Sequence, residues 1–208
     1  LFGGALNDTL TGNDGNDTLQ SGAGVDRVAG GDGIDLWNVD TSGRASTTVI
    51  DLVAQTTNYN ATLSGIERVT YTGGNAVDRV TAQAGVFDDV INTGDGNDVV
   101  TTGRGVDSSD GGLGPLDRLV MDWSGITDAR HGITTYGLGD YWTRYTSASG
   151  DRLDFRGFEI YQLTGGAGDD VLNGAALNDT LVGNGGDDTL NSGLGNGTVT
   201  GGDGNDLR

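Results

Sequence analysis

A nine-residue repeat, Gly-Gly-x-Gly-x-Asp-x-apolar-x, recurs in three blocks of this sequence and holds its phase within each block. Repeats of this kind are typical of proteins in which one unit cannot bury its apolar face alone and stacks on its neighbours. The glycine-rich part predicts a turn, because Gly, Asn and Asp tolerate backbone conformations with positive φ. The last three residues predict a short strand, whose alternation directs position eight inward and positions seven and nine outward. Two units complete one rung, so residue i is expected to lie over residue i+18.

The three blocks occupy residues 1–38, 73–114 and 165–208, and they are separated by spacers at 39–72 and 115–164. In the middle block the pattern fails at Ser109, which replaces the apolar residue of position eight. In the last block Gly197 replaces the aspartate of position six. Asp117 follows a turn one residue longer than the motif, so it stands outside the predicted set. We expect all five segments, residues 1–208, to form a single elongated domain, with the first spacer adding longer β-rungs.

The predicted stacking decides the chemistry of position six. Rungs of a parallel sheet lie about 4.8 Å apart, so Asp8 is expected over Asp26 and Asp188 over Asp206. Two carboxylates about 5 Å apart repel each other by roughly 3 kcal/mol at an effective dielectric near 20. Such columns need cations between the rungs. Calcium is favoured over magnesium because it accepts about six to eight oxygen ligands in irregular geometry, and turn carbonyls adjoin the carboxylates.

Composition agrees with this interpretation and excludes others. The chain has 40 Gly among its 208 residues, a net charge of −19, no Cys and one His, so zinc and copper lack their usual ligands. All but two of the 30 acidic residues are Asp, whose short side chain keeps the carboxylate within the turn; the exceptions are Glu67 and Glu159. The 11 basic residues are all Arg and are scattered, which argues against nucleic acid as a partner. No stretch approaches the roughly 20 apolar residues of a membrane span.

Three segments, GGDGIDLWN, GGAGDDVLN and GGDGNDLR, resemble the haemolysin-type calcium-binding repeats of bacterial RTX proteins. The spacer sequences TVIDLVAQ, TLSGIERVTYTGG and RLDFRGFEIYQLTGGAGDD are similar to stretches that lead into such arrays in large secreted RTX proteins. The resemblance implies an all-β fold, the parallel β-roll, which is a right-handed β-solenoid. It also implies several bound Ca²⁺ ions, each between turns of successive rungs.

The ligands that the resemblance implies are the position-six carboxylates and, with less support from the pattern, carbonyl groups of the turns. The carboxylates belong to Asp8, Asp17, Asp26, Asp35, Asp78, Asp89, Asp98, Asp107, Asp170, Asp179, Asp188 and Asp206. The carbonyl groups belong to Gly31, Gly33, Gly166, Gly168, Gly202 and Gly204.

The function implied by the resemblance is calcium-triggered folding after export. The chain is expected to pass through a type I secretion channel unfolded and to fold outside the cell, as a secreted or surface-attached bacterial protein. The absence of Cys fits such a protein, which uses calcium rather than disulfides as its staple. Leu1 and Phe2 fit positions eight and nine of a preceding repeat, and Arg208 stops before the last repeat is complete. A longer parent polypeptide is therefore expected beyond both ends.

The second spacer holds eight of the 13 aromatic residues and leaves an alternative open. Tyr141, Trp142 and Tyr145, with Asp140 and Arg144 as polar partners, could form a glycan-binding platform. Segment 136–145 would then make the chain an adhesin with an extracellular polysaccharide as partner. The other interpretation is structural: the aromatics are spaced as in a twisted hairpin and cover part of the roll.

No catalytic residues are predicted, and we expect no enzyme. His131 stands alone in a predicted loop. Asp122, Asp128, Asp151 and Asp154 could supply the paired carboxylates of a glycosidase, but Asp is abundant enough here to form such groups by chance. The serines show no Gly-x-Ser-x-Gly motif.

Overall fold

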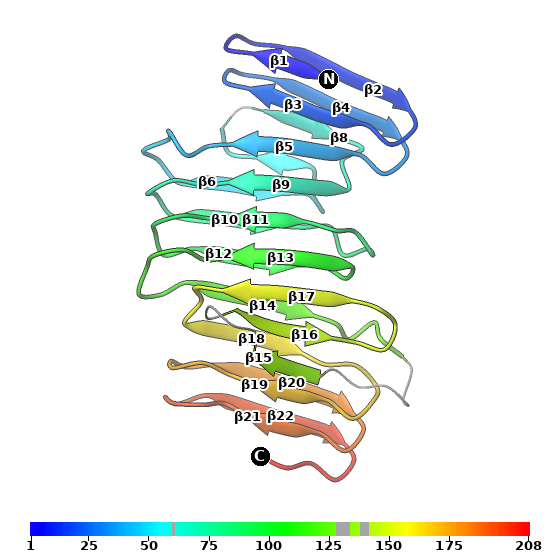
Figure 1. Ribbon diagram of the computed structural model, residues 1–208, viewed down its shortest axis with the longest axis vertical. Helices are drawn as coiled ribbons and strands as arrows, with labels where there is room; N and C mark the ends of the chain where they lie inside the picture. The colour runs from blue at the N-terminus through cyan, green and yellow to red at the C-terminus, as the bar shows by residue number, and fades with distance from the viewer. Residues whose placement is uncertain (60, 128–133, 138–141) are drawn as a thin grey trace.

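The chain forms an elongated stack of short β-strands with its two termini at opposite ends (Figure 1). The computed structural model describes residues 1–59, 61–127, 134–137 and 142–208, with the backbone alone for 134–137. Within these ranges the chain consists of strands, turns and extended loops, and no α-helix occurs. The all-β class expected from the nonapeptide repeat is therefore confirmed.

Two long sheets run along the stack, and the strands within each are mainly parallel. In the described part of the chain, the first sheet has nine strands in the order β1 (Phe2–Gly4), β3 (Thr18–Gly22), β5 (Leu36–Asp40), β9 (Arg68–Thr72), β11 (Val90–Asn92), β13 (Val106–Asp110), β17 (Arg152–Arg156), β16 (Thr143–Thr146) and β15 (Thr134–Gly137).

The second sheet of the described chain has 11 strands in the order β2 (Thr9–Asp14), β4 (Arg27–Asp32), β8 (Thr62–Ser64), β7 (Thr56–Thr57), β6 (Thr48–Asp51), β10 (Asp78–Thr81), β12 (Val99–Thr102), β14 (Arg118–Asp122), β18 (Ile160–Thr164), β20 (Thr180–Gly185) and β22 (Thr198–Asp203). A further parallel pair consists of β19 (Val171–Asn173) and β21 (Thr189–Asn191). These stacked parallel sheets confirm the β-roll.

The register matches the prediction in the first and last repeat blocks. Thr9 pairs with Arg27 and Thr180 with Thr198, so each residue lies beside the one 18 positions later. The middle block is looser: Arg79 pairs with Val99, a step of 20. Consecutive units alternate between the two sheets, because each glycine-rich turn carries the chain from one sheet to the other.

Both spacers depart from simple winding. In the first, β7 runs antiparallel between β6 and β8, so the segment folds back instead of only lengthening the rungs. Gln55 holds this reversal: its φ is 53°, its side-chain amide donates to the carbonyls of Leu52 and Ile66, and its Oε1 accepts the Ile66 N–H. In the second spacer, β15 and β16 form the expected antiparallel hairpin. The hairpin extends the first sheet beyond β17, and β15 lies against β19.

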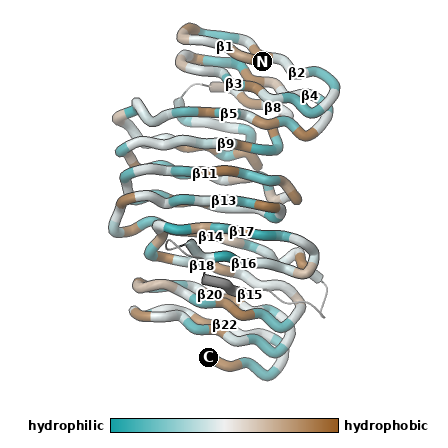
Figure 2. Tube along the Cα trace, in the orientation of Figure 1, coloured by the Kyte–Doolittle hydropathy of each residue, from teal (hydrophilic) through white to brown (hydrophobic). Residues whose placement is uncertain are grey.

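Position eight of each repeat faces the core, as alternation requires. Leu10, Val28 and Leu181 are at most 4 % exposed, whereas their neighbours at position seven, such as Thr9 and Arg27, are exposed. Figure 2 shows the result: polar and apolar residues are interspersed along the coil, with no continuous apolar block. Ser109 is also fully buried, so the position keeps its orientation although the residue is polar. Within the described residues, no helix has the length and apolarity needed to span a bilayer.

Candidate metal centre

The position-six aspartates form ladders along the roll. In most rungs the backbone N–H of one aspartate donates to Oδ1 of the aspartate in the next rung, which holds the carboxylates in register. The donor and acceptor residues are Asp8 and Asp26 at 3.0 Å, Asp17 and Asp35 at 2.8 Å, Asp78 and Asp98 at 2.7 Å, Asp89 and Asp107 at 2.9 Å, Asp170 and Asp188 at 2.8 Å, and Asp188 and Asp206 at 3.2 Å.

The second carboxylate oxygen of many of these residues has no protein partner. Oδ2 is buried and accepts no hydrogen bond in Asp8, Asp17, Asp35, Asp78, Asp89, Asp98, Asp107, Asp117 and Asp188. A buried ionised oxygen without a partner is strongly unfavourable. The ladders therefore present a row of acceptor atoms that need a positive charge.

The groups that lie beside this oxygen explain why position one is glycine. A Cβ at Gly12 would clash with Oδ2 of Asp17 and with the carbonyl oxygen of Gly30 in the next rung. A Cβ at Gly183 would meet Oδ2 of Asp188 and the carbonyl oxygen of Gly201. Position one is thus glycine because carboxylate and carbonyl oxygens crowd the space where a side chain would begin.

Positions two and four favour glycine for a different reason, and Asn13 and Asn184 take position two with positive φ in other repeats. Gly31 and Gly33 have φ values of 116° and 144°, and Gly202 and Gly204 have 118° and 134°. These backbone conformations let successive turns stack closely, since a Cβ on Gly202 would also meet the Asn184 carbonyl. Gly33 and Gly204 lie in bends between strands as predicted, whereas Gly31 and Gly202 lie near the ends of strands β4 and β22.

The turn that begins the last block differs. The φ of Gly166 lies outside the left-handed region, and its N–H donates to Oδ2 of Asp170 at 2.8 Å. The Ala175 N–H donates to Oδ2 of Asp179 at 2.7 Å in the following turn. These two carboxylates are therefore satisfied from within their own turns. Gly168 lies beside Gly186 of the next rung, because a Cβ added at Gly186 would clash with the carbonyl carbon of Gly168.

Burial raises the pKa of the carboxyls in the middle block. Desolvation raises the pKa of Asp89 to about 7, although the hydrogen bond from Val69 opposes it. Desolvation likewise raises the pKa of Asp107 to about 8, and the neighbouring charge of Asp89 adds to the effect. The pKa of Asp188 is raised for the same reason, with a contribution from Asp206. Without a counter-charge, burial therefore favours the protonated form of these three carboxyls.

Two ladders stop where the sequence replaces the acidic residue. Asp179 lies beside Gly197, as predicted, because Thr180 pairs with Thr198. Asp26 lies beside Ala61 of the first spacer, because Arg27 pairs with Thr62. Each of these aspartates therefore has a carboxylate neighbour on one side of its column at most.

Sequence reasoning missed three ladder residues. Asp117 is fully buried and accepts the Asp98 N–H at 2.7 Å, so it belongs to the ladder although it follows a turn longer than the motif. The longer turn is accommodated without moving the carboxylate out of the column. Glu67 accepts the Asp35 N–H at 2.9 Å, and Glu159 accepts the Asp117 N–H at 3.0 Å. The signal was a half-repeat, Gly-x-Glu-x-apolar, present in both spacers.

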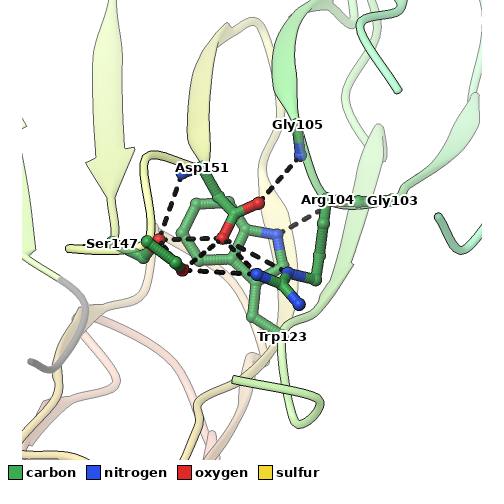
Figure 3. A network of polar contacts seen from close by, with 7 residues as sticks. Gly103, Arg104, Gly105, Trp123, Ser147 and Asp151 are labelled. Carbon is green, nitrogen blue, oxygen red and sulfur yellow. Dashed lines mark hydrogen bonds and ion pairs between the residues drawn. The ribbon is translucent and has the colours of Figure 1, made fainter. Parts of the chain in front are cut away.

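Beside the first-sheet ladder, a guanidinium partners a carboxylate. Figure 3 shows Asp151 between Arg104, Ser147 and Gly105. The Arg104 guanidinium lies 2.9 Å from Oδ2 of Asp151, and the Gly105 N–H donates to Oδ1 at 3.1 Å. Although burial acts to raise it, hydrogen bonds from Arg104, Ser149 and Ser147 leave the pKa of the Asp151 carboxyl below its usual value. Arg104 supplies here the positive charge that the ladder carboxylates lack.

The described residues of the aromatic platform suggested for the second spacer make contacts within the protein. Tyr145 is fully buried, and its hydroxyl donates to the Asn173 carbonyl, so it packs in the core. Arg144 is engaged by Asp154 at 2.6 Å, and the ring of Trp142 lies under the Arg156 guanidinium. Asp128, His131, Asp140 and Tyr141, and the side chain of Tyr136, lie outside the described residues.

Three of the candidate glycosidase carboxylates lie in the described part of the chain, and each makes contacts within the protein. Asp151 and Asp154 pair with arginines, and Asp122 is exposed with Oδ1 accepting the Ser124 N–H. Hydrogen bonds from Arg144 lower the pKa of Asp154 against the effect of burial. A general acid needs a raised pKa, so neither arginine-paired carboxylate suits that role.

The donor set of the ladders fits a hard divalent cation. Across the described ranges, no group of three or more His, Cys, Asp or Glu side chains gathers in the manner of a side-chain metal site. The ladder instead offers one carboxylate per turn with adjacent backbone carbonyls. Calcium accepts such a mixture readily, whereas zinc and copper favour nitrogen and sulfur ligands. The assignment of individual aspartates and glycines as ligands stays a prediction.

Comparison with known families gives one match. The family described as RTX calcium-binding nonapeptide repeat (4 copies) matches residues 2–36, 72–108, 83–115, 164–199 and 174–207, which together cover more than half of the chain. No curated protein matches the sequence.

Proposed function

The chain belongs to the RTX calcium-binding nonapeptide repeat family, and from this premise we propose that it is a calcium-folded module of a secreted or cell-surface bacterial protein. The turns at position six supply the ligands. The module acts as a scaffold and has no catalytic step of its own.

The observation that carries the proposal is the row of buried Oδ2 atoms without protein partners. Each of these carboxylates except those of Asp8 and Asp17, in the first repeats, already uses Oδ1 to accept a backbone N–H, as Asp35 does for the Asp17 N–H. Its second oxygen is left beside a turn carbonyl of the next rung in several turns, for example Asp17 beside Gly30. A bound Ca²⁺ supplies positive charge and additional coordination to these oxygens.

Folding of the chain is proposed to depend on that charge. The glycine-rich turns lose much backbone entropy on ordering, and position eight supplies at most one buried apolar side chain in each repeat. Carboxylates such as Asp89 and Asp107 are buried side by side, at a cost that raises their pKa values. A ligand that binds only the folded form offsets both costs by mass action, and stacked sites that share turns fold cooperatively.

The proposed cellular role follows from calcium concentration. Extracellular calcium modules bind in the range of about 10⁻⁴ to 10⁻³ M. A chain with this affinity stays unfolded where calcium is scarce, which suits export through a type I secretion channel. It then folds at the cell surface or in the medium.

A calcium titration followed by far-UV circular dichroism tests the proposal, with magnesium at equal ionic strength as the control. We expect a steep transition from coil to β-structure near millimolar calcium, and no such transition with magnesium. A chain that is already folded in chelator, or one that responds equally to magnesium, would contradict it.

A further inference from the structure

The two glutamates of the chain occupy equivalent places in the two spacers. Glu67 lies beside Asp35, because Leu36 pairs with Arg68 in neighbouring strands β5 and β9. Glu159 lies beside Asp117, because Arg118 pairs with Ile160 in β14 and β18. Both glutamates are thus in position six of an incomplete repeat.

The turns before the glutamates are also alike. Gly65 and Gly157 stand two residues ahead of the glutamates and have φ values of 59° and 71°. The residues at position five, Ile66 and Phe158, are at most 6 % exposed, unlike Ile34 of an ordinary repeat, which is 42 % exposed. The incomplete turns are therefore folded onto the core, and their glutamates still reach the ladder.

Each glutamate makes the bond that an aspartate makes elsewhere. Oε2 of Glu67 accepts the Asp35 N–H at 2.9 Å, and Oε2 of Glu159 accepts the Asp117 N–H at 3.0 Å. After each glutamate the column steps by two residues: Asp89 binds the N–H of Val69, and Asp179 binds that of Tyr161. The glutamates are the last carboxylates before these steps.

The aspartates covered by the glutamates have unsatisfied oxygens. Asp35 and Asp117 are fully buried, and Oδ2 of each accepts no hydrogen bond. A Cβ at Gly30 would clash with both Oδ2 of Asp35 and the carbonyl oxygen of Gly65. The same crowding by a carboxylate and a next-rung carbonyl occurs at Gly12 inside the first block. The space between Asp35 and the Glu67 turn therefore has the donor set of an array site.

We propose that Glu67 and Glu159 are calcium ligands that complete two sites with Asp35 and Asp117, so that the ion ladder extends from the nonapeptide blocks into both spacers. The inference rests on the proposed calcium function. In each proposed site, the glutamate contributes a charged oxygen beside the buried Oδ2 of its aspartate. The spacers are then ordered by calcium as the repeats are.

The test counts bound calcium ions by native mass spectrometry and measures their affinities by titration calorimetry. Glu67→Gln and Glu159→Gln keep an oxygen that can accept the aspartate N–H but remove the charge. Each is expected to bind one ion fewer than the wild type, or to bind one ion at least tenfold more weakly, and the double variant is expected to show both losses. Glu67→Asp and Glu159→Asp retain a carboxylate and should retain the ion count.

Two controls separate the possible failures. Asp122→Asn removes one exposed charge outside the ladder and should leave binding unchanged. Asp188→Asn removes a carboxylate of the last block and should lose binding. Glutamine variants with wild-type ion number and affinity beside a deficient Asp188→Asn would overturn the glutamate sites and leave the calcium function intact. A loss shared equally by the Gln and Asp variants would also overturn them, because it would reflect packing. A wild-type chain that binds no calcium would overturn the proposed function itself.

Discussion

At the scale of the residue, the position-six carboxylate has two separate tasks. In Asp188, Oδ1 accepts the Asp170 N–H, while Oδ2 is buried without a protein partner. The first oxygen aligns the rungs and could be replaced by any acceptor. The second oxygen is buried and charged, so it needs a cation beside it. The neutral oxygen of an amide in the same place would attract a cation less strongly.

Removing the carboxylate should weaken calcium-dependent folding to a degree set by its neighbours. Asp188→Ala should raise the calcium midpoint more than Asp26→Ala, because Asp188 lies between Asp170 and Asp206 whereas Asp26 lies beside Ala61. Circular dichroism during calcium titration measures both midpoints. Unchanged midpoints in both variants would show that position six does not hold the ions.

The raised pKa values predict an effect of pH on the calcium-free chain. The pKa values of Asp89 and Asp107 in the folded chain, about 7 and about 8, lie above the unfolded value near 4. Protons therefore stabilise the folded form: this stability is full below about pH 4 and is lost as pH rises through about 7 to 8. In chelator, β-structure should increase as pH falls from about 8 to 5, and the calcium midpoint should rise over the same range.

The Asp89→Asn/Asp107→Asn double variant provides the control for pH. Its neutral side chains imitate the protonated carboxyls, so its calcium-free form should respond less to pH than the wild type. Circular dichroism in chelator across the pH range compares the two chains. An equal response in both would assign the pH effect to other groups.

At the scale of the element, the turn depends on glycine in two distinct ways. A side chain at Gly12 meets a carboxylate and a carbonyl, whereas Gly15 has φ 110° with open space around it. The first restriction combines the Asp17 carboxylate of the same repeat with the Gly30 carbonyl of the next rung, and the second arises from the backbone itself. The contact with the next rung is absent from an isolated turn.

Gly12→Ala should therefore destabilise the calcium-loaded chain more than Gly15→Ala, which carries only the left-handed strain of about 1–2 kcal/mol. Gly43→Ala is the matched control, since nothing lies within 4 Å of a Cβ there. Urea unfolding in saturating calcium measures the three free energies. Equal effects at Gly12 and Gly43 would contradict the crowding seen at position one.

The Arg104–Asp151 pair should stabilise its rung without calcium. Arg104→Met leaves a carboxylate that is 2 % exposed without its cation, and should lower the free energy of unfolding by about 3 kcal/mol. The number of bound calcium ions should not change. Arg79→Met, at an exposed position on the second sheet, serves as the control and should have an effect below about 0.5 kcal/mol. Loss of an ion in Arg104→Met would contradict a metal-independent role.

At the scale of the whole molecule, the carboxylate ladders and the two sheets share one axis. The order of strands in the second sheet runs from β2 near the N-terminus to β22 near the C-terminus (Figure 1). With a net charge of −19 distributed along this axis, the calcium-free chain repels itself at every rung. Neutralisation of this charge by bound calcium should therefore make the whole chain more compact.

Small-angle scattering should detect this change in dimensions. In chelator the radius of gyration should approach the roughly 50 Å of an unfolded chain of this length. In calcium it should fall sharply, and the distance distribution should become that of a rod. Magnesium at equal ionic strength should leave the chain expanded. A compact rod in chelator would show that the sheets alone suffice to hold the fold.

The repeat determined the coil of stacked short strands, the step of 18 residues in the first and last blocks, the inward position eight and the aspartate columns, because a fixed period repeats the same local geometry at every rung. It could not predict what happens where the period breaks. The antiparallel strand β7 arises from a local chain reversal at Gln55, whereas the packing of β15 against β19 and the burial of Tyr145 beside Asn173 depend on contacts between segments farther apart in the chain. The places of Asp117, Glu67 and Glu159 in the ladders were likewise decided by the tertiary structure, since only stacking shows which carboxylate meets which amide.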